Sequence, residues 1–195
     1  MTTYELDGLT LAHCDLMDTA ANRQRYSPVL LAAYNEAYGR ACREALRPVA
    51  WVQITVENGS FPLTALEGLD GAGVLAVRRE YDPARDEMPG LHWRLMEDRV
   101  WVEGAAGDSL WVRYRRRAEP LLNPNPATGE GATAPALLPS YRHTMLCHAG
   151  EAALWRMERQ YARADQAQAR FEGMLAALAR AGDATLRGLY RTLPE

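Results

Sequence analysis

The chain has 195 residues, 48% of them hydrophobic, and a formal net charge of -3. This length and composition indicate a globular chain with a sizeable core and exclude an intrinsically disordered one. The small net charge argues neither for nor against a polyanionic partner of the whole chain.

The cysteines and the N-terminal sequence indicate where the protein is made. Cys14, Cys42 and Cys147 are far apart and form no CxxC motif, which favours buried, reduced thiols. No basic segment followed by an apolar run begins the chain, and no window approaches the ~18 consecutive apolar residues of a membrane span. We therefore expect a soluble protein made in the cytoplasm, without membrane contacts.

The first part of the chain is predicted to be helical. Residues 1–26 form an N-terminal segment with a short amphipathic stretch. Ser27 and Pro28 then predict a helix start, because serine caps helices and proline suits the first helical position. Apolar residues at helical spacing follow, and Pro48 ends the helix. Residues 27–48 are the first part of the expected helical core.

Residues 49–118 change to a period of two, which predicts a β-rich insertion, a small antiparallel meander. Its strands at 99–103 and 109–115 are expected to form a hairpin, with Trp101 and Trp111 as a cross-strand pair on one face. A face of Trp and Arg is typical of a protein interface, although burial of these Trp by the chain's own helices is the simpler interpretation.

The C-terminal half begins with a Pro-rich linker or arm over residues 119–136. Residues 137–181 are then predicted to form one long helix, because Pro139 suits its first turn and no further proline interrupts the helical period. At ~1.5 Å per residue this rod is roughly 60 Å long, more than the domain needs. The tail, 182–195, is expected to require a partner to become ordered.

The expected fold class is therefore α+β and mainly helical. It is a helix bundle dominated by one long C-terminal helix, with the β meander inserted between the helices. Met157, Tyr161, Phe171 and Leu175 are predicted to hold the long helix to its own bundle, while its arginine face meets a neighbouring subunit.

The sequence contains few signals of catalysis or metal binding. It has no GxSxG, HExxH, Walker A or GxGxxG motif. The nearest metal pattern is His143 and Cys147, one helical turn apart, with His148 a quarter-turn further round. From this weak pattern we predict a core cysteine with surface histidines, no metal site and no cofactor.

Two groups of carboxylates lie in polar, turn-like segments. They are residues 82–87 and the pair Glu97 and Asp98, and solvated acids are the simpler interpretation. The alternative is a hydrolase that uses Asp86 or Glu97, although nothing places two carboxylates across a substrate. We predict no enzyme activity.

One basic run, Arg113, Arg115, Arg116 and Arg117, stands out. Such a run can contact phosphates, or it can end a solvated strand. Without interleaved aromatics or a recognition-helix pattern, sequence-specific binding is not expected. A passive lining of a DNA channel stays open, as does a nucleic-acid-binding accessory protein.

Four groups of residues follow one another in a recognisable order. The groups that carry the resemblance are Asn35, Ala37 and Tyr38; Val112, Arg113 and Tyr114; Leu138, Pro139 and Tyr141; and Phe171, Leu175 and Leu178. In this order, over residues 15–180, the chain resembles head-to-tail adaptor proteins of tailed bacteriophages, also called connector or head-completion proteins. These groups are packing patterns rather than chemical signatures.

The resemblance implies a structural protein of the virion neck that is assembled in the host cytoplasm. In this setting the alternative enzyme would be a virion-associated cell-wall hydrolase. It would form a homo-oligomeric ring of about twelve copies, docked on the portal protein. The ring extends the channel through which double-stranded DNA passes non-specifically, and it joins the head to a tail or neck protein below.

The resemblance also suggests roles for particular residues. The tail is expected to dock on the portal through Arg187, Leu189, Tyr190 and Arg191. The subunit interface is expected to contain Trp101, Trp111, Arg156, Arg159 and Arg163. The run of Arg113, Arg115, Arg116 and Arg117 is the candidate lining of the DNA channel.

Overall fold

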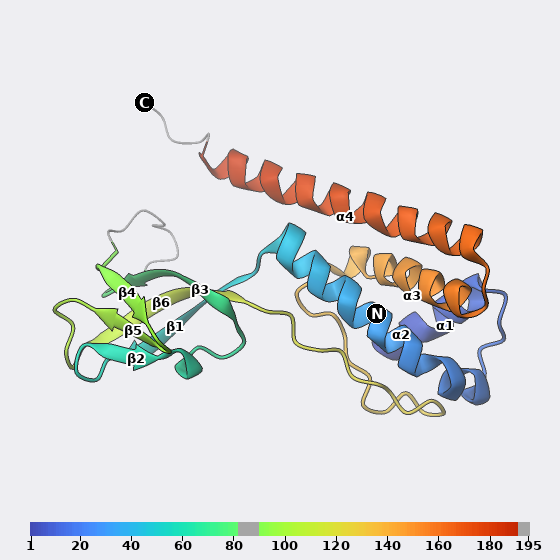
Figure 1. Cartoon of the computed structure of the whole chain (residues 1–195), viewed down its shortest axis with the longest axis horizontal. Helices are drawn as coiled ribbons and strands as arrows, with labels where there is room; N and C mark the ends of the chain where they lie inside the picture. Colours follow the sequence, from blue (N-terminus) through green and yellow to red (C-terminus); the bar gives the residue numbers. More distant parts are fainter. Residues whose placement is uncertain (82–89, 191–195) are drawn as a thin grey trace. The chain divides into compact units, whose positions relative to one another are not determined.

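The computed structural model describes residues 1–81 and 90–190, except for the side chains of residues 72 and 182–190. The chain divides into two compact units (Figure 1). The helical unit consists of Met1–Leu46 and Ala118–Glu195, and the β unit consists of Arg47–Arg117. Each unit has its own apolar core.

The first two helices of the helical unit are α1 (Thr3–His13) and α2 (Ala20–Arg40), which continues into the π-helical segment η1 (Ala41–Leu46). Thr2 and Glu5 form a capping box at the start of α1. The predicted helix start at Pro28 is wrong, because the side chain of Thr19 caps α2 and Pro28 lies inside that helix. The pair Ser27 and Pro28 does not by itself distinguish a proline at the start of a helix from a proline inside one.

The expected single C-terminal helix, and with it the expected fold class, is wrong. The segment forms two helices, α3 (Thr144–Met157) and α4 (Tyr161–Tyr190), preceded by a short 3-10 turn, η3 (Ser140–Arg142). The chain reverses at Arg159, which has a φ of 58°, and α4 packs alongside α3 (Figure 1). Because α2 with η1 covers 20–46, no one C-terminal helix dominates this α+β fold.

The reversal between α3 and α4 explains a second error. Met157 and Tyr161, predicted to pack in the core, are 41% and 64% exposed at the turn. Phe171 and Leu175 do enter the core, where they meet Tyr34, Tyr38, Met145 and other apolar residues of α1 to α3. Gly150 permits close packing there, since a Cβ would lie 2.7 Å from the ring of Tyr34.

The Pro-rich segment packs on the helical unit as an ordered strap. The Asn35 side chain accepts a hydrogen bond from the backbone N–H of Leu121 (2.7 Å) and donates one to its carbonyl (3.1 Å). The backbone of Thr3 donates to Thr133 (2.7 Å), and Leu137 donates to the hydroxyl of Tyr38 (2.9 Å). The side chains of Asn35 and Tyr38 and the backbone of Thr3 thus supply the partners that a segment without helix or strand lacks.

The β unit contains two antiparallel sheets, each of three strands, rather than the expected meander. One sheet has the order β1 (Val49–Thr55), β6 (Ser109–Arg116), β3 (Leu69–Arg78). The other has the order β2 (Ser60–Pro62), β5 (Arg99–Val102), β4 (Trp93–Met96), and a short 3-10 turn, η2 (Leu63–Ala65), follows β2. Both sheets contribute to one core.

The predicted hairpin between β5 and β6 is also wrong. Trp101 on β5 pairs with Arg94 and Ser60, whereas Trp111 on β6 pairs with Gln53 and Arg78. The two Trp therefore lie in different sheets. The connection between β5 and β6 contains Gly104 and Gly107, both with positive φ, and it carries the chain from one sheet to the other.

Candidate functional site

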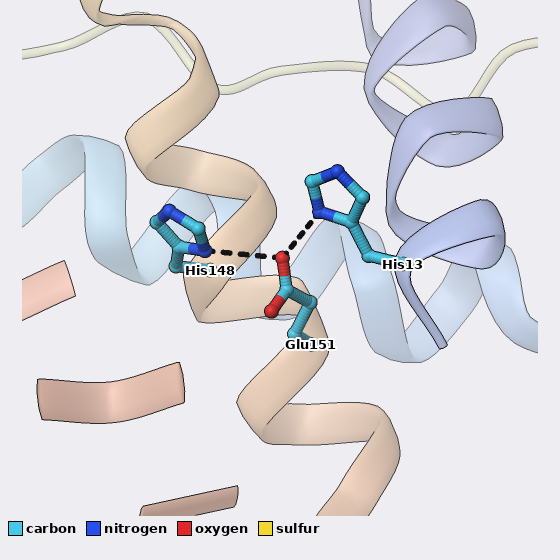
Figure 2. Close-up of side chains that lie close together, drawn as sticks. All are labelled: His13, His148 and Glu151. Carbon is cyan, nitrogen blue, oxygen red and sulfur yellow. Dashed lines mark hydrogen bonds and ion pairs between the residues drawn. The ribbon is translucent and has the colours of Figure 1, made fainter. Parts of the chain in front are cut away.

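Three polar side chains meet between α1 and α3 of the helical unit. They are His13, His148 and Glu151, and one ligand atom of each lies within 4.8 Å of the other two (Figure 2). Nδ1 of His13 lies 2.6 Å from Oε1 of Glu151, and Nδ1 of His148 lies 3.0 Å from the same oxygen. Two imidazoles therefore converge on one carboxylate oxygen.

The helices place these side chains in a simple way. His13 is the last residue of α1, and α1 packs against α3. His148 and Glu151 are three residues apart on α3, which puts them on neighbouring positions of one helix face. Figure 2 shows His13 approaching from α1, opposite the two side chains of α3.

Glu151 is the buried member of this cluster. Its side chain is 5% exposed, whereas that of His148 is 19% and that of His13 is 41% exposed. A buried carboxylate requires polar partners, and both imidazoles supply them. Nη1 of Arg170 on α4 lies 3.9 Å from the second oxygen, Oε2, and adds a positive charge on that side.

The neighbouring thiol does not join the cluster. Cys14 follows His13 directly and is buried, and burial followed by the charge of Glu151 raises the pKa of its thiol to about 12. Cys14 is also not among the residues whose ligand atoms lie within 4.8 Å of one another. The chemistry of the cluster is therefore that of two imidazoles and a carboxylate.

An open hollow of about 240 Å³ lies against the cluster. Beyond His13 and Glu151, its lining includes Asp15, Trp155, Arg163, Gln166 and Arg170. The lining gives the cluster a polar approach from solvent, with side chains of both signs of charge. The arrangement is suited to holding a cation or to accepting a small polar ligand.

The sequence pointed to a different combination of residues. The prediction of His143 as a surface histidine is wrong, because His143 is buried and its Nε2 lies 2.8 Å from the carbonyl of Leu138. Cys147 is buried beside Leu6, which matches the interpretation as a core cysteine. Of that trio only His148 belongs to the cluster. The spacing His148-x-x-Glu151 was a usable local signal, but His13 is distant in sequence and only the packing of α1 on α3 reveals it.

The predicted interface arginines surround the turn between α3 and α4. We call the exposed set Arg156, Met157, Arg159, Tyr161 and Arg163 the α3–α4 corner. Arg163 lies over the ring of Trp155, with its guanidinium carbon 4.7 Å from the ring centroid. The corner joins two large apolar side chains to three arginines, a composition favoured in protein interfaces.

The two predicted interface tryptophans have different surroundings in the β unit. Trp101 is 38% exposed and borders a hollow of about 350 Å³ with His92, Trp93 and Arg94. Trp111 is half-buried, and Tyr81 lies between it and Trp51, with ring centroids 5.0 Å and 4.8 Å away. Trp101 and Trp111 therefore do not form one surface.

The predicted arginine run does not form a single stripe either. On β6, Arg113 and Arg115 point to one face and Arg116 to the other, because side chains alternate along a strand. Arg113 is half-buried, with its guanidinium carbon 6.0 Å from the centroid of Trp51, while Arg115 and Arg117 are exposed. The run offers separate charges rather than a continuous track.

Other predicted residues lie outside what the structure describes or in simple turns. The side chains of Arg187, Leu189 and Tyr190 are not among the described ones, and Arg191 and Asp86 lie outside the described residues. Glu97 and Asp98 are exposed in the turn between β4 and β5, where Glu97 has a φ of 56°. Solvation explains this pair.

Comparison with models of known protein families gives no match, and neither does comparison with curated proteins. Among the helices that the structure describes, none combines the length and apolar character that crossing a membrane requires. The function is therefore argued from the residues and the resemblance that they carry.

Proposed function

We propose that the chain is a structural adaptor of a phage neck, which forms a ring on the portal and joins the head to the tail. The ring would extend the DNA channel, with double-stranded DNA passing non-specifically, and a tail or neck protein would bind below. The protein acts by presenting surfaces, and no catalytic step is assigned to it.

The observation that carries this proposal is the α3–α4 corner. Met157 and Tyr161 are large apolar side chains that stay exposed although the chain has a well-packed core nearby. Arg156, Arg159 and Arg163 surround them. Arginine and aromatic side chains dominate binding energy at many interfaces, so this corner is the best candidate for a contact between neighbouring copies.

The division into two units supports the same proposal. A closed ring of identical copies is a heterologous assembly, so each copy needs two different surfaces that complement each other. The helical unit supplies the corner, and the β unit supplies a second surface at Trp101 and its hollow. Further surfaces remain for the portal and for the tail-side protein.

The ordered Pro-rich strap fits a passive role in assembly. Asn35 and Tyr38, two residues of the resemblance, hold the strap through three hydrogen bonds to its backbone. The pattern shared with adaptors thus has a structural use here, the attachment of the chain that returns from the β unit.

The test is the mass of the purified chain by light scattering, alone and mixed with the portal protein of the phage that encodes it. We expect a defined complex containing several copies per portal. A chain that stays monomeric in both conditions would overturn the proposal. The same mixture with an unrelated ring-shaped protein is the control for non-specific association.

A further inference from the structure

We propose that His13, His148 and Glu151 form a binding site for a divalent transition metal ion of the zinc class. The site would link the end of α1 to α3. This inference does not depend on the adaptor role, because it rests on the arrangement of the three side chains alone.

The donor set has the right chemistry. Imidazole nitrogen suits zinc, copper, nickel and iron, and a carboxylate oxygen is a common third ligand beside two histidines. Ions that prefer oxygen-only shells, such as calcium and magnesium, fit two imidazoles poorly. The three side chains together supply two nitrogen ligands and one oxygen ligand.

The geometry needs little adjustment. Bonds of about 2.0–2.2 Å in a tetrahedral shell place ligand atoms roughly 3.3 Å apart. The two nitrogen-to-oxygen distances at Glu151 are 2.6 Å and 3.0 Å, so a bound ion requires the imidazoles to move by less than about one bond length. His13 is the most exposed ligand and stands at a helix end, where such movement is easiest.

The surroundings leave a fourth coordination position. The cluster borders the hollow lined by Asp15, Arg163 and Arg170, from which water or an acidic group can reach the ion. Arg170 approaches Oε2 of Glu151 and not the oxygen that both imidazoles face. Oε1 of Glu151 is therefore the atom that would coordinate the ion, and Oε2 would stay next to Arg170.

A metal here would fasten the N-terminal helix to the bundle. An ion that binds the folded chain and not the unfolded one adds its binding free energy to stability. His13 ends α1, and without the ion the polar tie of this residue to α3 is its short contact with Glu151. Metal binding would thus stabilise the attachment of α1 in particular.

The test is calorimetric titration of the full chain with Zn²⁺ after treatment with a chelator and removal of any purification tag. We expect one ion per chain. His13→Ala and Glu151→Gln should each weaken binding by at least about 100-fold, since losing an outer-shell partner already costs about 10–100-fold. His92→Ala is the matched control, because His92 is an exposed histidine of the β unit.

Two further measurements make the outcome unambiguous. Co²⁺ in place of Zn²⁺ should give the absorption of nitrogen and oxygen ligands without a thiolate charge-transfer band, and Zn²⁺ should raise the Tm of the natural chain but not of His13→Ala. His13 is 41% exposed, so this variant tests the site even if Glu151→Gln does not fold. Absence of saturable binding, equal binding by His13→Ala, or a thiolate spectrum would overturn the proposal.

Discussion

Nδ1 of His13 lies 2.6 Å from Oε1 of Glu151, although 138 residues separate the two in sequence. The two segments of the helical unit, one before and one after the β unit, thus meet in one polar contact at the edge of a packed core. The contact fixes the end of α1 against the middle of α3. It also brings together three side chains with the donor atoms of a metal site.

Gly150 is expected to be essential for the approach of α1 and α2 to α3. A Cβ at this position would lie 2.7 Å from Cε1 of Tyr34 and 3.1 Å from Leu30. Gly150→Ala should therefore lower the free energy of unfolding by about 1–3 kcal/mol, measured by urea denaturation. Gly173→Ala on α4 is the matched control and should be stabilising by about 0.5–1 kcal/mol, because open space surrounds its position. Equal effects of both changes would contradict this packing.

The buried carboxyl of Asp7 should give stability a particular pH dependence. Burial raises its pKa above 3.8, against the opposing hydrogen bond from Ser27 (2.7 Å). Folding therefore favours the protonated carboxyl, and the free energy of unfolding falls as the pH rises from about 4 through the folded-state pKa. Asp7→Asn cannot ionise, so its stability relative to the natural chain should increase over that range.

A variant of Ser27 checks that the pH dependence of stability comes from Asp7. Removing its hydroxyl takes away a hydrogen bond that lowers the pKa of Asp7, so Ser27→Ala should extend the loss of stability to higher pH. Chemical denaturation at a series of pH values measures both variants. A difference between Asp7→Asn and the natural chain that stays constant with pH would contradict the burial argument.

The thiols of Cys14 and Cys147 should resist alkylation in the folded protein. Burial is the main cause that raises their pKa values, to about 12 and about 11. Since the thiolate is the reactive form, iodoacetamide at pH 8 should leave both unlabelled until denaturant is added. Mass spectrometry of the labelled peptides measures this, and rapid labelling of Cys147 without denaturant would show that the core opens.

The α3–α4 corner should be needed for assembly and not for folding. Met157→Glu and Tyr161→Glu place a charge at exposed positions, so the Tm should change little while the multi-copy complex with the portal is lost. Met17→Glu is the matched control, because Met17 is 74% exposed and lies outside the corner. Light scattering of the mixture reports the outcome, and an unchanged complex with both corner variants would remove the corner from the interface.

Local patterns in the sequence were sufficient for some parts of the fold. The change of period after Pro48 marks the start of the β unit, and the inward residues Val100, Val102, Leu110 and Val112 all reach one core. These features depend on alternation along one strand. Such alternation holds whichever sheet the strand joins.

The failures share a physical cause. Nothing in the apolar period reveals that the chain reverses at Arg159, because α3 and α4 each continue the same helical spacing and no Gly or Pro marks the turn. Likewise, which strands pair depends on the packing of the whole core and not on the sequence of one strand. The sequence therefore predicted that β5 pairs with β6, whereas the two strands belong to different sheets.

The candidate metal site shows the same limit. His148 and Glu151 are neighbours on a helix face, but the sequence pattern was interpreted as His143, Cys147 and His148, without Glu151. The structure supplies the third ligand, His13, from α1, through a contact between two helices that are far apart in sequence. The spacing along α3 can indicate His148 and Glu151, but His13 becomes a candidate ligand only through the packing of α1 against α3.

Electron cryomicroscopy of the chain bound to its portal tests the central claim most directly. The account predicts a closed ring of copies on the portal, with the α3–α4 corner of each copy against its neighbour. Density for single, separated copies, or a portal that carries none, would contradict it.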